Sequence, residues 1–220
     1  MLSASKRIQA FIKKEKRLPN YVIMEDLDKK KEVQLRPSEY NGLFKATNIF
    51  RLKNNRLPNY VTLNTTEKTP LAMDYQDNAY TCAPTSLSMA IQLLYGFKSE
   101  KECKKACKTK EYKGGGTSPE NLIKGAKSLG YKVEPIQRKY TNVAASLTTS
   151  KPVIAHIQTK PAHCLGYKND YGHYLLIYGT KSANTYLLAD PTKGLKTCSS
   201  TVLDKATNGR NIHYYSVGVI

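Results

Sequence analysis

The stretch DYQDNAYTCAPTSLSMAIQLL, residues 74–94, decides the fold of this chain. Its second half predicts a helix from about residue 83 to residue 95, because apolar side chains recur at the spacing of one helix face: Leu87, Ala90, Ile91 and Leu94. Gly96 is a typical helix stop. Cys82 stands immediately before the helix, and Pro84 falls in its first turn, where a missing amide costs nothing.

The cysteine at this helix start has two possible roles. A thiolate there would be stabilised by the positive end of the helix dipole, which favours a nucleophile. A structural cysteine is equally compatible with the position alone. Gln76 lies six residues earlier. Its side-chain amide and the backbone amide of Cys82 could together donate to the oxyanion of a tetrahedral intermediate. Because glutamines before helices are common, Gln76 alone does not decide between the two roles.

Further helices precede a series of strands. Ser99 and Glu102 form a capping box for a short helix through Cys107, and the glycine loop in GGGTSPENL, residues 114–122, runs into a helix capped by Ser118. The loop lacks the Lys-Ser/Thr of a phosphate-binding motif. Five strand-like segments follow: YKVEPI, PVIAHI, YGHYLLIYGT, NTYLLADP and IHYYSVGV. Helices first and an antiparallel sheet afterwards predict an α+β fold.

Two of these strands place a histidine and an aspartate where they could meet. His173 opens HYLLIYG, Asp190 closes TYLLAD, and residues 180–183 between the two segments predict a hairpin. In an antiparallel pair the two residues would be cross-strand neighbours within hydrogen-bond reach. A base and the carboxylate that orients it require this geometry. We therefore predict Cys82 as nucleophile, His173 as general base and Asp190 as orienting residue, in the papain-like chain order.

The other histidines are weaker candidates. His156 lies in the middle of a strand, where it is expected to pack or to face solvent. His213 begins the last strand without an acidic neighbour. His163 adjoins Cys164, but adjacent side chains point apart and do not readily pair.

The other cysteines do not predict a metal site or a disulfide framework. Cys103 and Cys107 lie four residues apart on a helix, without a second pair to complete a zinc site, so we expect them to be reduced thiols. Cys164 and Cys198 lie in loop-like stretches. The odd count of five and the irregular spacing do not resemble a disulfide framework.

The first part of the chain contains a repeat. KEKRLPNYVIM at residues 14–24 returns as KNNRLPNYVTL at residues 53–63, a period of 39 residues. Each copy follows an amphipathic helical stretch and leads into a short apolar strand, and its proline would end the helix. The helix before the second copy is expected to start at Ser38. Residues 1–66 are thus expected to form one small α/β module, and residues 67–220 a second domain.

The chain is strongly basic. It carries 35 Lys and Arg against 17 Asp and Glu, a net charge of +18. Residues 1–68 hold 15 of the basic and 7 of the acidic residues, so the charge is spread along the chain. This implies acidic partners, such as nucleic acid, anionic lipid or an anionic cell-wall polymer, although charge can also serve solubility alone. No zinc-finger, ribonucleoprotein or basic-zipper pattern supports nucleic acid.

No targeting segment is recognisable. The basic N-terminal stretch lacks an apolar run of signal-peptide length, and no segment approaches the roughly 20 apolar residues needed to span a membrane. We therefore expect synthesis in the cytoplasm, release by other means if the protein acts outside the cell, and no membrane partner.

The segments quoted above resemble a known family. QDNAYTCAPTSLSMAIQLLYG, GHYLLIYG and LLADP look like catalytic segments of the bacteriocin-processing, papain-like cysteine peptidases. The RLPNYV module is similar to the pseudomurein-binding repeat of methanogen cell-wall proteins. Together they resemble the pseudomurein endoisopeptidases, the lysins of viruses and proviruses of methanogenic archaea. Ala83 departs from related peptidases, which often have glycine straight after the cysteine.

The resemblance implies a papain-like cysteine peptidase domain, with N-terminal helices and a C-terminal antiparallel sheet, behind a wall-binding module. It implies hydrolysis of the bond between alanine and the lysine side-chain amine in pseudomurein peptide bridges, with Cys82, His173, Asp190 and Gln76 in the roles given above. The enzyme would reach the wall of the host cell after release, and its partner would be the pseudomurein polymer. The module supplies candidate wall-binding residues, although its tyrosines could equally be packing: Asn20, Tyr21, Asn59 and Tyr60.

Some expectations and alternatives remain at this stage. A monomer without an organic cofactor is expected. A divalent-cation requirement is left open, since Asp77 and acidic loop residues could hold calcium, but no contiguous calcium loop is present. The alternative activities are cleavage of a leader peptide after paired glycines, and wall binding without catalysis.

Overall fold

The structure is a computed structural model that describes residues 13–14, 22–26, 31–35, 73–94, 96, 98–149, 151–207 and 214–220. The chain divides into two compact units, residues 1–72 with 219–220, and residues 73–218. In the first unit β1 (Val22–Asp26) pairs antiparallel with β2 (Lys31–Leu35). β1 is the strand expected after the first RLPNYV copy, and β2 was not predicted. Several predicted features lie outside the described residues: Asn20, Tyr21, the helix after Ser38, the second repeat copy with Asn59 and Tyr60, and His213.

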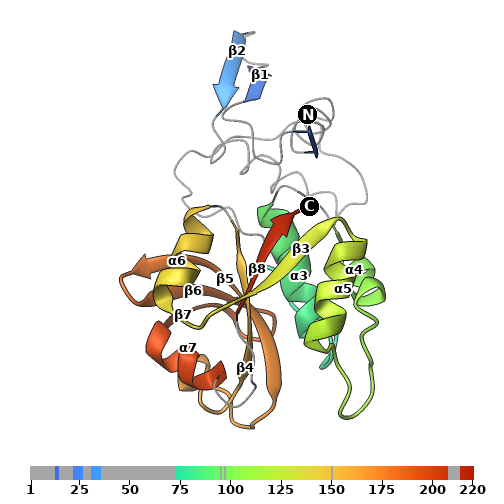
Figure 1. Ribbon diagram of the computed structural model, residues 1–220, viewed down its shortest axis with the longest axis vertical. Helices are drawn as coiled ribbons and strands as arrows, with labels where there is room; N and C mark the ends of the chain where they lie inside the picture. The colour runs from blue at the N-terminus through green and yellow to red at the C-terminus, as the bar shows by residue number, and fades with distance from the viewer. Residues whose placement is uncertain are drawn as a thin grey trace. The chain divides into compact units, whose positions relative to one another are not determined.

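The second unit has the predicted α+β organisation (Figure 1). Three helices come first: α3 (Cys82–Leu93), α4 (Glu100–Ala106) and α5 (Pro119–Ser128). A six-stranded sheet of order β3-β8-β4-β5-β6-β7 follows, and its inner pairs from β8 to β7 are antiparallel. Its strands are β3 (Tyr131–Ile136), β4 (Val153–Gln158), β5 (Gly172–Ser182), β6 (Thr185–Asp190), β7 (Gly194–Ser199) and β8 (Tyr214–Val219).

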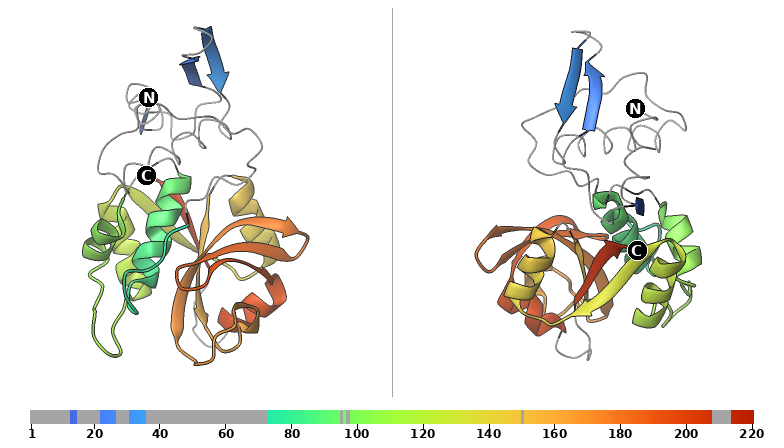
Figure 2. Two further views of the ribbon diagram at one scale, coloured as in Figure 1. Left: turned by 180° about the vertical axis from the view of Figure 1, so that it is seen from behind. Right: turned by 45° about the horizontal axis from the view of Figure 1, so that its top comes forward.

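Two further helices and one short 3₁₀ turn lie among the strands: α6 (Tyr140–Thr148), α7 (Ser200–Thr207) and η1 (His163–Leu165). Helices α3–α5 gather on one side of this unit, and α6 and α7 lie on the other, as Figure 1 and the reverse view in Figure 2 show. Helix α3 contacts β4 and β5, and α6 and α7 also contact β4. The sheet therefore separates the helix that begins at Cys82 from the two later helices.

The helix boundaries follow the capping residues. The Ser99–Glu102 capping box is present at the start of α4, and the Ser118 side chain accepts a hydrogen bond from the Asn121 amide at the start of α5. Helix α3 begins at Cys82 itself rather than one residue later, with Thr81 as its N-cap residue. Its residues from Ala83 to Ile91 are buried, which makes α3 the central helix of the unit.

In the second unit, the sequence prediction lacked helices α6 and α7, the short turn η1 and strand β7. Strand β7 is the edge strand of the sheet, and most of its side chains are exposed. It therefore lacks the apolar alternation that identifies a half-buried strand. The hairpin between β5 and β6 also differs from the prediction, because β5 continues through Ser182 and the turn falls at Ala183–Asn184. Asn184 adopts a φ of 59°, a conformation that asparagine tolerates better than most residues.

The cysteines differ from the expectation at one pair. Cys164 and Cys198 form a disulfide that joins η1 to β7, so Cys198 lies in a strand rather than in a loop. Their separation of 34 residues gave no local signal, because β7 itself had not been predicted. Cys103 and Cys107 are free thiols, as expected, and both are buried. Burial raises the pKa of the Cys107 thiol to about 12, so this thiol stays protonated at neutral pH.

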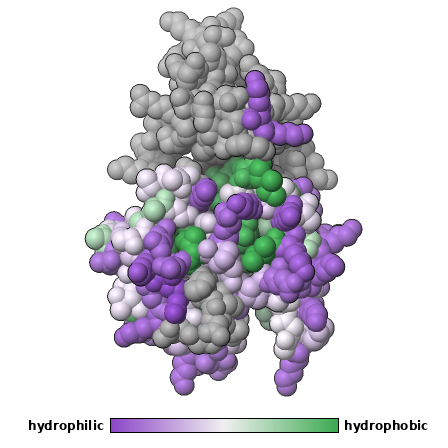
Figure 3. Space-filling model, in the orientation of Figure 1, coloured by the Kyte–Doolittle hydropathy of each residue, from purple (hydrophilic) through white to green (hydrophobic). Residues whose placement is uncertain are grey.

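The described surface is largely hydrophilic in the view of Figure 3, with a few apolar side chains exposed between the polar ones. Among the described residues, none of the helices has the length and apolar character needed to cross a membrane.

Candidate active site

Cys82 occupies the first position of the central helix. Its side chain is half-buried, and Thr81 before it is fully buried. The first backbone hydrogen bond at this end of α3 runs from the Thr85 amide to the Thr81 carbonyl. The amides of Cys82 and Ala83 lie before it, where a helix has no acceptor of its own to offer. The thiol therefore lies beside backbone donors at the positive end of the helix dipole.

His173 and Asp190 are in contact, as predicted. The His173 Nε2 lies 3.0 Å from Asp190 Oδ1, with 2% and 0% of the two residues exposed. They are not directly opposed strand partners, however. The β5–β6 pairing begins at Leu176 and Ala189, so His173 lies beyond the paired segment and reaches Asp190 diagonally. His173 is paired instead with Ile157 of β4 on its other side.

This pair carries opposed pKa shifts. Burial alone would lower the pKa of His173, but hydrogen bonds to Asp190 and to Cys82, with the charges of both groups, outweigh it and raise the pKa to about 9. Burial alone would raise the pKa of Asp190, but the hydrogen bonds and the charge of His173 bring it below the usual value. The site therefore favours an imidazolium between a carboxylate and the cysteine sulfur.

Tyr167, which was not predicted as a site residue, contacts both His173 and Asp190. The Tyr167 hydroxyl is 2.8 and 2.9 Å from the two oxygens of Asp190 and 3.1 Å from His173 Nε2. Tyr167 follows η1 in a loop and is one of sixteen tyrosines. No pattern in the sequence distinguishes it from the others.

Gln76 lies in the loop before α3 and lines the same cleft as Cys82. Its Nε2 donates to the Asn78 carbonyl at 2.6 Å, and its Oε1 accepts a hydrogen bond from the Thr192 hydroxyl at 3.0 Å. A carbonyl can only accept, so the Asn78 contact fixes which end of the amide is nitrogen. Nε2 has two protons, and the second remains for a substrate oxygen.

The loop that carries Gln76 is attached to the helices by a buried glutamate. Glu100, at the start of α4, accepts hydrogen bonds from the Asp77 amide at 3.1 Å and from the Thr85 hydroxyl at 2.7 Å. The same loop is also attached to the sheet side of the cleft, because the backbone amide of Gln76 donates to the Pro191 carbonyl at 3.0 Å. Gln76 is therefore held from both sides of the cleft.

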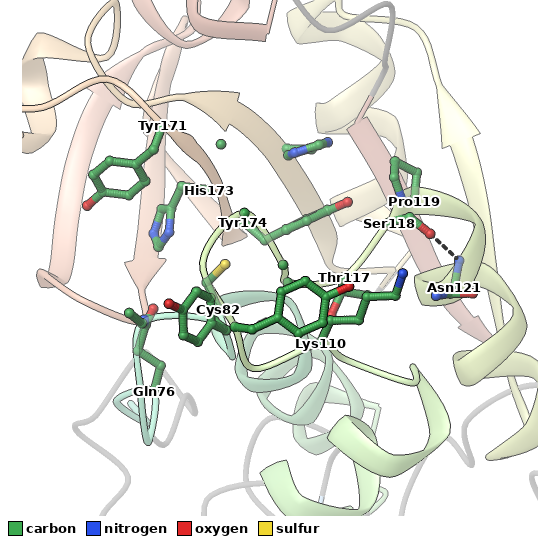
Figure 4. A pocket seen from close by; sticks show the side chains of 18 of the residues that line it. Gln76, Cys82, Lys110, Thr117, Ser118, Pro119, Asn121, Tyr171, His173 and Tyr174 are labelled. Atoms are coloured by element: carbon green, nitrogen blue, oxygen red, sulfur yellow. Dashed lines mark hydrogen bonds between the residues drawn. The ribbon is translucent and has the colours of Figure 1, made fainter.

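The cleft around Cys82 has a volume of about 910 Å³ (Figure 4). The Cys82 sulfur lies next to the His173 ring, and Tyr171 and Tyr174 line the sheet side. The glycine loop at 114–116, to which the sequence assigned no functional role, forms part of the opposite wall with Lys110 and Thr117. An added Cβ at Gly115 would lie 2.3 Å from the Lys110 carbonyl oxygen, so this wall needs glycine at that position.

Of the two environments expected for His156, packed or facing solvent, the structure shows the packed one. His156 is 6% exposed, stacks on Tyr174 with ring centroids 4.0 Å apart, and contributes to the cleft lining. His163 is part of η1. Among the described residues, no group of three or more histidine, cysteine, aspartate or glutamate side chains could hold a metal ion.

Comparison with known proteins identifies the family. The profile of the Peptidase C39 family matches residues 71–210, which include the helical segment, the cleft and most of the sheet. The chain belongs to the Peptidase C39 family. It is a papain-like cysteine peptidase in fold, and Cys82 is the one cysteine that lines the cleft; all five cysteines lie among the described residues.

Solved structures resemble this C39 chain at low identity. A C39-like peptidase from Bacillus anthracis is 13% identical, with 67% of this chain and 94% of that one covered and a TM-score of 0.52. The peptidase domain of Streptococcus ComA, a bifunctional ABC transporter involved in quorum sensing, is 17% identical, with 66% and 94% covered and a TM-score of 0.49. A double-glycine motif protease from an AMS/PCAT transporter, solved with its leader peptide, is 16% identical, with 68% and 92% covered and a TM-score of 0.49. No protein of curated function matches the sequence.

Proposed function

We propose that this C39 peptidase hydrolyses the isopeptide bond between alanine and the lysine side-chain amine in pseudomurein peptide bridges and so opens methanogen cell walls. The contact of His173 with Asp190, next to the Cys82 thiol, is the observation that carries the chemistry. The substrate rests on the RLPNYV repeat, which is similar to pseudomurein-binding repeats.

The reaction is an acyl transfer in two stages. The Cys82 thiolate, paired with the His173 imidazolium, attacks the alanyl carbonyl carbon, and the electrons of the C=O bond move to oxygen. The free Gln76 Nε2 proton and the Cys82 backbone amide donate to this oxyanion. His173 then protonates the departing lysine amine as the C–N bond breaks, which leaves an acyl-enzyme. In the second stage neutral His173 takes a proton from water, the hydroxide attacks the acyl carbon, and the thiolate leaves.

Charge supports an acidic polymer as substrate. The chain carries +18, and the exposed Lys110 lies in the cleft wall opposite the sheet. Peptide carboxylates and the uronic acid of the glycan would be attracted to such a protein. The attraction between exposed charges weakens as salt screens it, with a Debye length of about 10 Å at 0.1 M.

The test is release of lysine side-chain amines from purified pseudomurein by the full chain under mild reduction. Wild-type protein is compared with Cys82→Ala and with Cys103→Ala, a matched change at a buried cysteine outside the cleft. We expect new amines from wild type and Cys103→Ala and none from Cys82→Ala. Repeating the assay with a chelator tests the divalent-cation requirement.

Two results would replace this proposal. Cleavage of a peptide after paired glycines, without release of wall amines, would make the protein a leader-processing peptidase. Wall binding that is equal in wild type and Cys82→Ala, without any cleavage, would make it a wall-binding protein that has lost catalysis.

A further inference from the structure

Tyr167 makes three polar contacts inside the Cys82–His173–Asp190 set without lining the cleft. Its hydroxyl lies 2.8 Å from Asp190 Oδ1, 2.9 Å from Oδ2 and 3.1 Å from His173 Nε2. The Tyr167 and His173 rings are tilted against each other with centroids 5.4 Å apart. The hydroxyl therefore contacts the general base His173 and the orienting Asp190, but it does not line the cleft in which a substrate would bind.

The chemistry of these groups decides where the protons are. An ionised Asp190 only accepts, so both Tyr167 O–H and His173 Nε2–H must be donors. The hydroxyl proton goes to the carboxylate. The Nε2 proton is shared between Asp190 Oδ1 at 3.0 Å and the Tyr167 oxygen at 3.1 Å. The other ring nitrogen, Nδ1, is left for the hydrogen bond with Cys82.

This arrangement resists rotation of the imidazole. A ring turned by half a revolution would direct carbon atoms at Asp190 and Tyr167 and would lose both acceptors of the Nε2 proton. Without the tyrosine hydroxyl, only one acceptor would oppose that rotation. Asp190 would also lose one of the donors that keep it ionised, leaving His173 and the backbone amides of Thr192 and Lys193.

The loop around Tyr167 is itself held in several places. The disulfide between Cys164 and Cys198 joins it to β7 three residues before the tyrosine. The Thr159 hydroxyl donates to the Asn169 carbonyl at 2.7 Å, two residues after it. The Lys193 amine lies 5.0 Å from the centre of the Tyr167 ring, close enough for a cation–π contact. The hydroxyl is thus preorganised for its contact with Asp190 and His173.

We propose that Tyr167 is a fourth member of this set, a positioning residue whose hydroxyl locks His173 in the orientation that presents Nδ1 to Cys82 and keeps Asp190 ionised. The inference rests on the proposed peptidase chemistry but is independent of the substrate. A purely structural tyrosine would contribute to stability alone, so the two roles can be separated by reactivity.

The substitution that removes only the hydroxyl is Tyr167→Phe. Tyr214→Phe is its matched control, because the buried Tyr214 hydroxyl donates to Asp204 Oδ1 at 2.6 Å away from the cleft. Two readouts are measured: the rate of iodoacetamide alkylation at Cys82 against pH, followed by mass spectrometry, and the kcat and KM for wall-amine release. Burial of Cys103 and Cys107 keeps alkylation of these thiols slow.

We expect Tyr167→Phe to lower kcat about tenfold with little change in KM, since a hydrogen bond to a charged group is lost outside the cleft. The acid side of the alkylation profile should move to higher pH, because Asp190 takes up a proton more readily and then no longer stabilises the His173 imidazolium. In an Asp190→Asn background, Tyr167→Phe should change kcat less than about twofold, because the two groups act together. Tyr214→Phe should alter stability alone.

An unchanged alkylation profile and kcat in Tyr167→Phe would overturn the positioning role, as would equal changes in Tyr214→Phe or fully additive effects with Asp190→Asn. The substrate is tested separately. A shift in Cys82 reactivity between wild type and Tyr167→Phe, together with no release of wall amines by the wild type, would contradict the pseudomurein proposal and support the role of Tyr167. If Cys82 in the wild type reacts no faster near pH 6 than a small free thiol, both proposals fail, because no thiolate–imidazolium pair exists.

Discussion

The Thr192 hydroxyl donates a hydrogen bond to the Gln76 side-chain oxygen at 3.0 Å, across 116 residues of sequence. Thr192 lies in the turn after Asp190, and its own backbone amide donates to Asp190 Oδ1 at 2.8 Å. One residue therefore connects the orienting carboxylate to the proposed oxyanion donor. The turn at Thr192 fixes the distance between the Asp190 carboxylate and the Gln76 side-chain amide, whereas Cys82 belongs to helix α3.

Loss of the Thr192 hydroxyl should slow turnover, because the side-chain amide of Gln76 would no longer be held in its orientation. Because this hydrogen bond is exposed and water can partly replace it, we expect Thr192→Val to lower kcat about three- to tenfold. Gln76→Ala should lower it by about a hundredfold or more, as expected for an oxyanion donor. Thr192→Ser keeps the hydroxyl and is the control. If Thr192→Val matched wild type while Gln76→Ala was slow, the hydroxyl would have no part in aiming the amide.

Glu100 should link stability to activity. It is 7% exposed and accepts from the Asp77 amide and the Thr85 hydroxyl. Glu100→Ala leaves the part-buried Asp77 contact without its acceptor, whereas the Thr85 hydroxyl can still donate to the Thr81 carbonyl at 2.7 Å. We expect a loss of about 1–3 kcal/mol in the free energy of unfolding, measured with urea, together with a lower kcat because the Gln76 loop is released. Glu102→Ala removes the half of the neighbouring capping box in which the Glu102 carboxylate accepts from the Ser99 backbone amide, and it should cost no more than about 1 kcal/mol.

Kinetics distinguish these two glutamates. The Glu102 side chain contacts Ser99 and Lys98 at the start of α4, away from the loop that carries Gln76, so its variant should keep the wild-type kcat in conditions where both proteins are folded. Equal kcat values for Glu100→Ala and Glu102→Ala would show that the Glu100 contacts serve folding only.

The raised pKa of His173 predicts the alkaline limit of activity. Its imidazolium must protonate the leaving amine, so kcat/KM should fall as the pH passes about 9, the pKa to which Asp190 and Cys82 raise His173 against the effect of burial. Asp190→Asn removes the carboxylate charge and should move this limit to lower pH. A pH profile of kcat/KM for both proteins measures the shift, and coincident alkaline limits would contradict the assignment.

The same group affects stability in a defined direction. Because the pKa of His173 is raised on folding, its protonated form favours the folded state. This contribution is fully present below about pH 6.5, the usual histidine pKa, and is lost as the pH rises through about 9. Urea unfolding at pH 7 and pH 10 should therefore show a larger decrease in wild type than in His173→Gln.

The sequence was sufficient for those parts of the site that carry local signals. Cys82 was located by its place before an amphipathic helix, and His173 and Asp190 by the ends of two apolar strands. Even there, the strand register was wrong in detail, because β5 continues through Ser182 and the turn falls at Ala183–Asn184 rather than at residues 180–183. The contact survives this error because both residues lie at strand ends, where side chains reach one another diagonally.

The parts that were missed depend on contacts distant in sequence. Tyr167, Thr192 and Glu100 have no motif of their own, and each is recognised only by the group it touches. The edge strand β7 is mostly exposed and so has no apolar pattern. Without that strand, the Cys164–Cys198 disulfide could not be inferred either, since spacing alone does not define a pair.

The disulfide supplies the last prediction, because it fixes the loop that carries Tyr167. A loop of 34 residues closed by a disulfide loses chain entropy in the unfolded state, which corresponds to roughly 3–4 kcal/mol of stability. We expect the Cys164→Ala/Cys198→Ala variant to lose about this much in urea unfolding and to lower kcat by releasing Tyr167. Cys103→Ala, which removes a buried free thiol, should leave kcat unchanged.

Strong reductant provides the internal check. Wild-type protein with the disulfide reduced should approach the double variant in both stability and kcat, whereas the double variant itself should not respond to reductant. Mild reducing conditions that keep the Cys82 thiol reduced but preserve the half-buried Cys164–Cys198 disulfide should give the highest activity. If wild type and the double variant unfold at the same urea concentration without reductant, the bond does not contribute to the fold, and Tyr167 must be held by its noncovalent contacts alone.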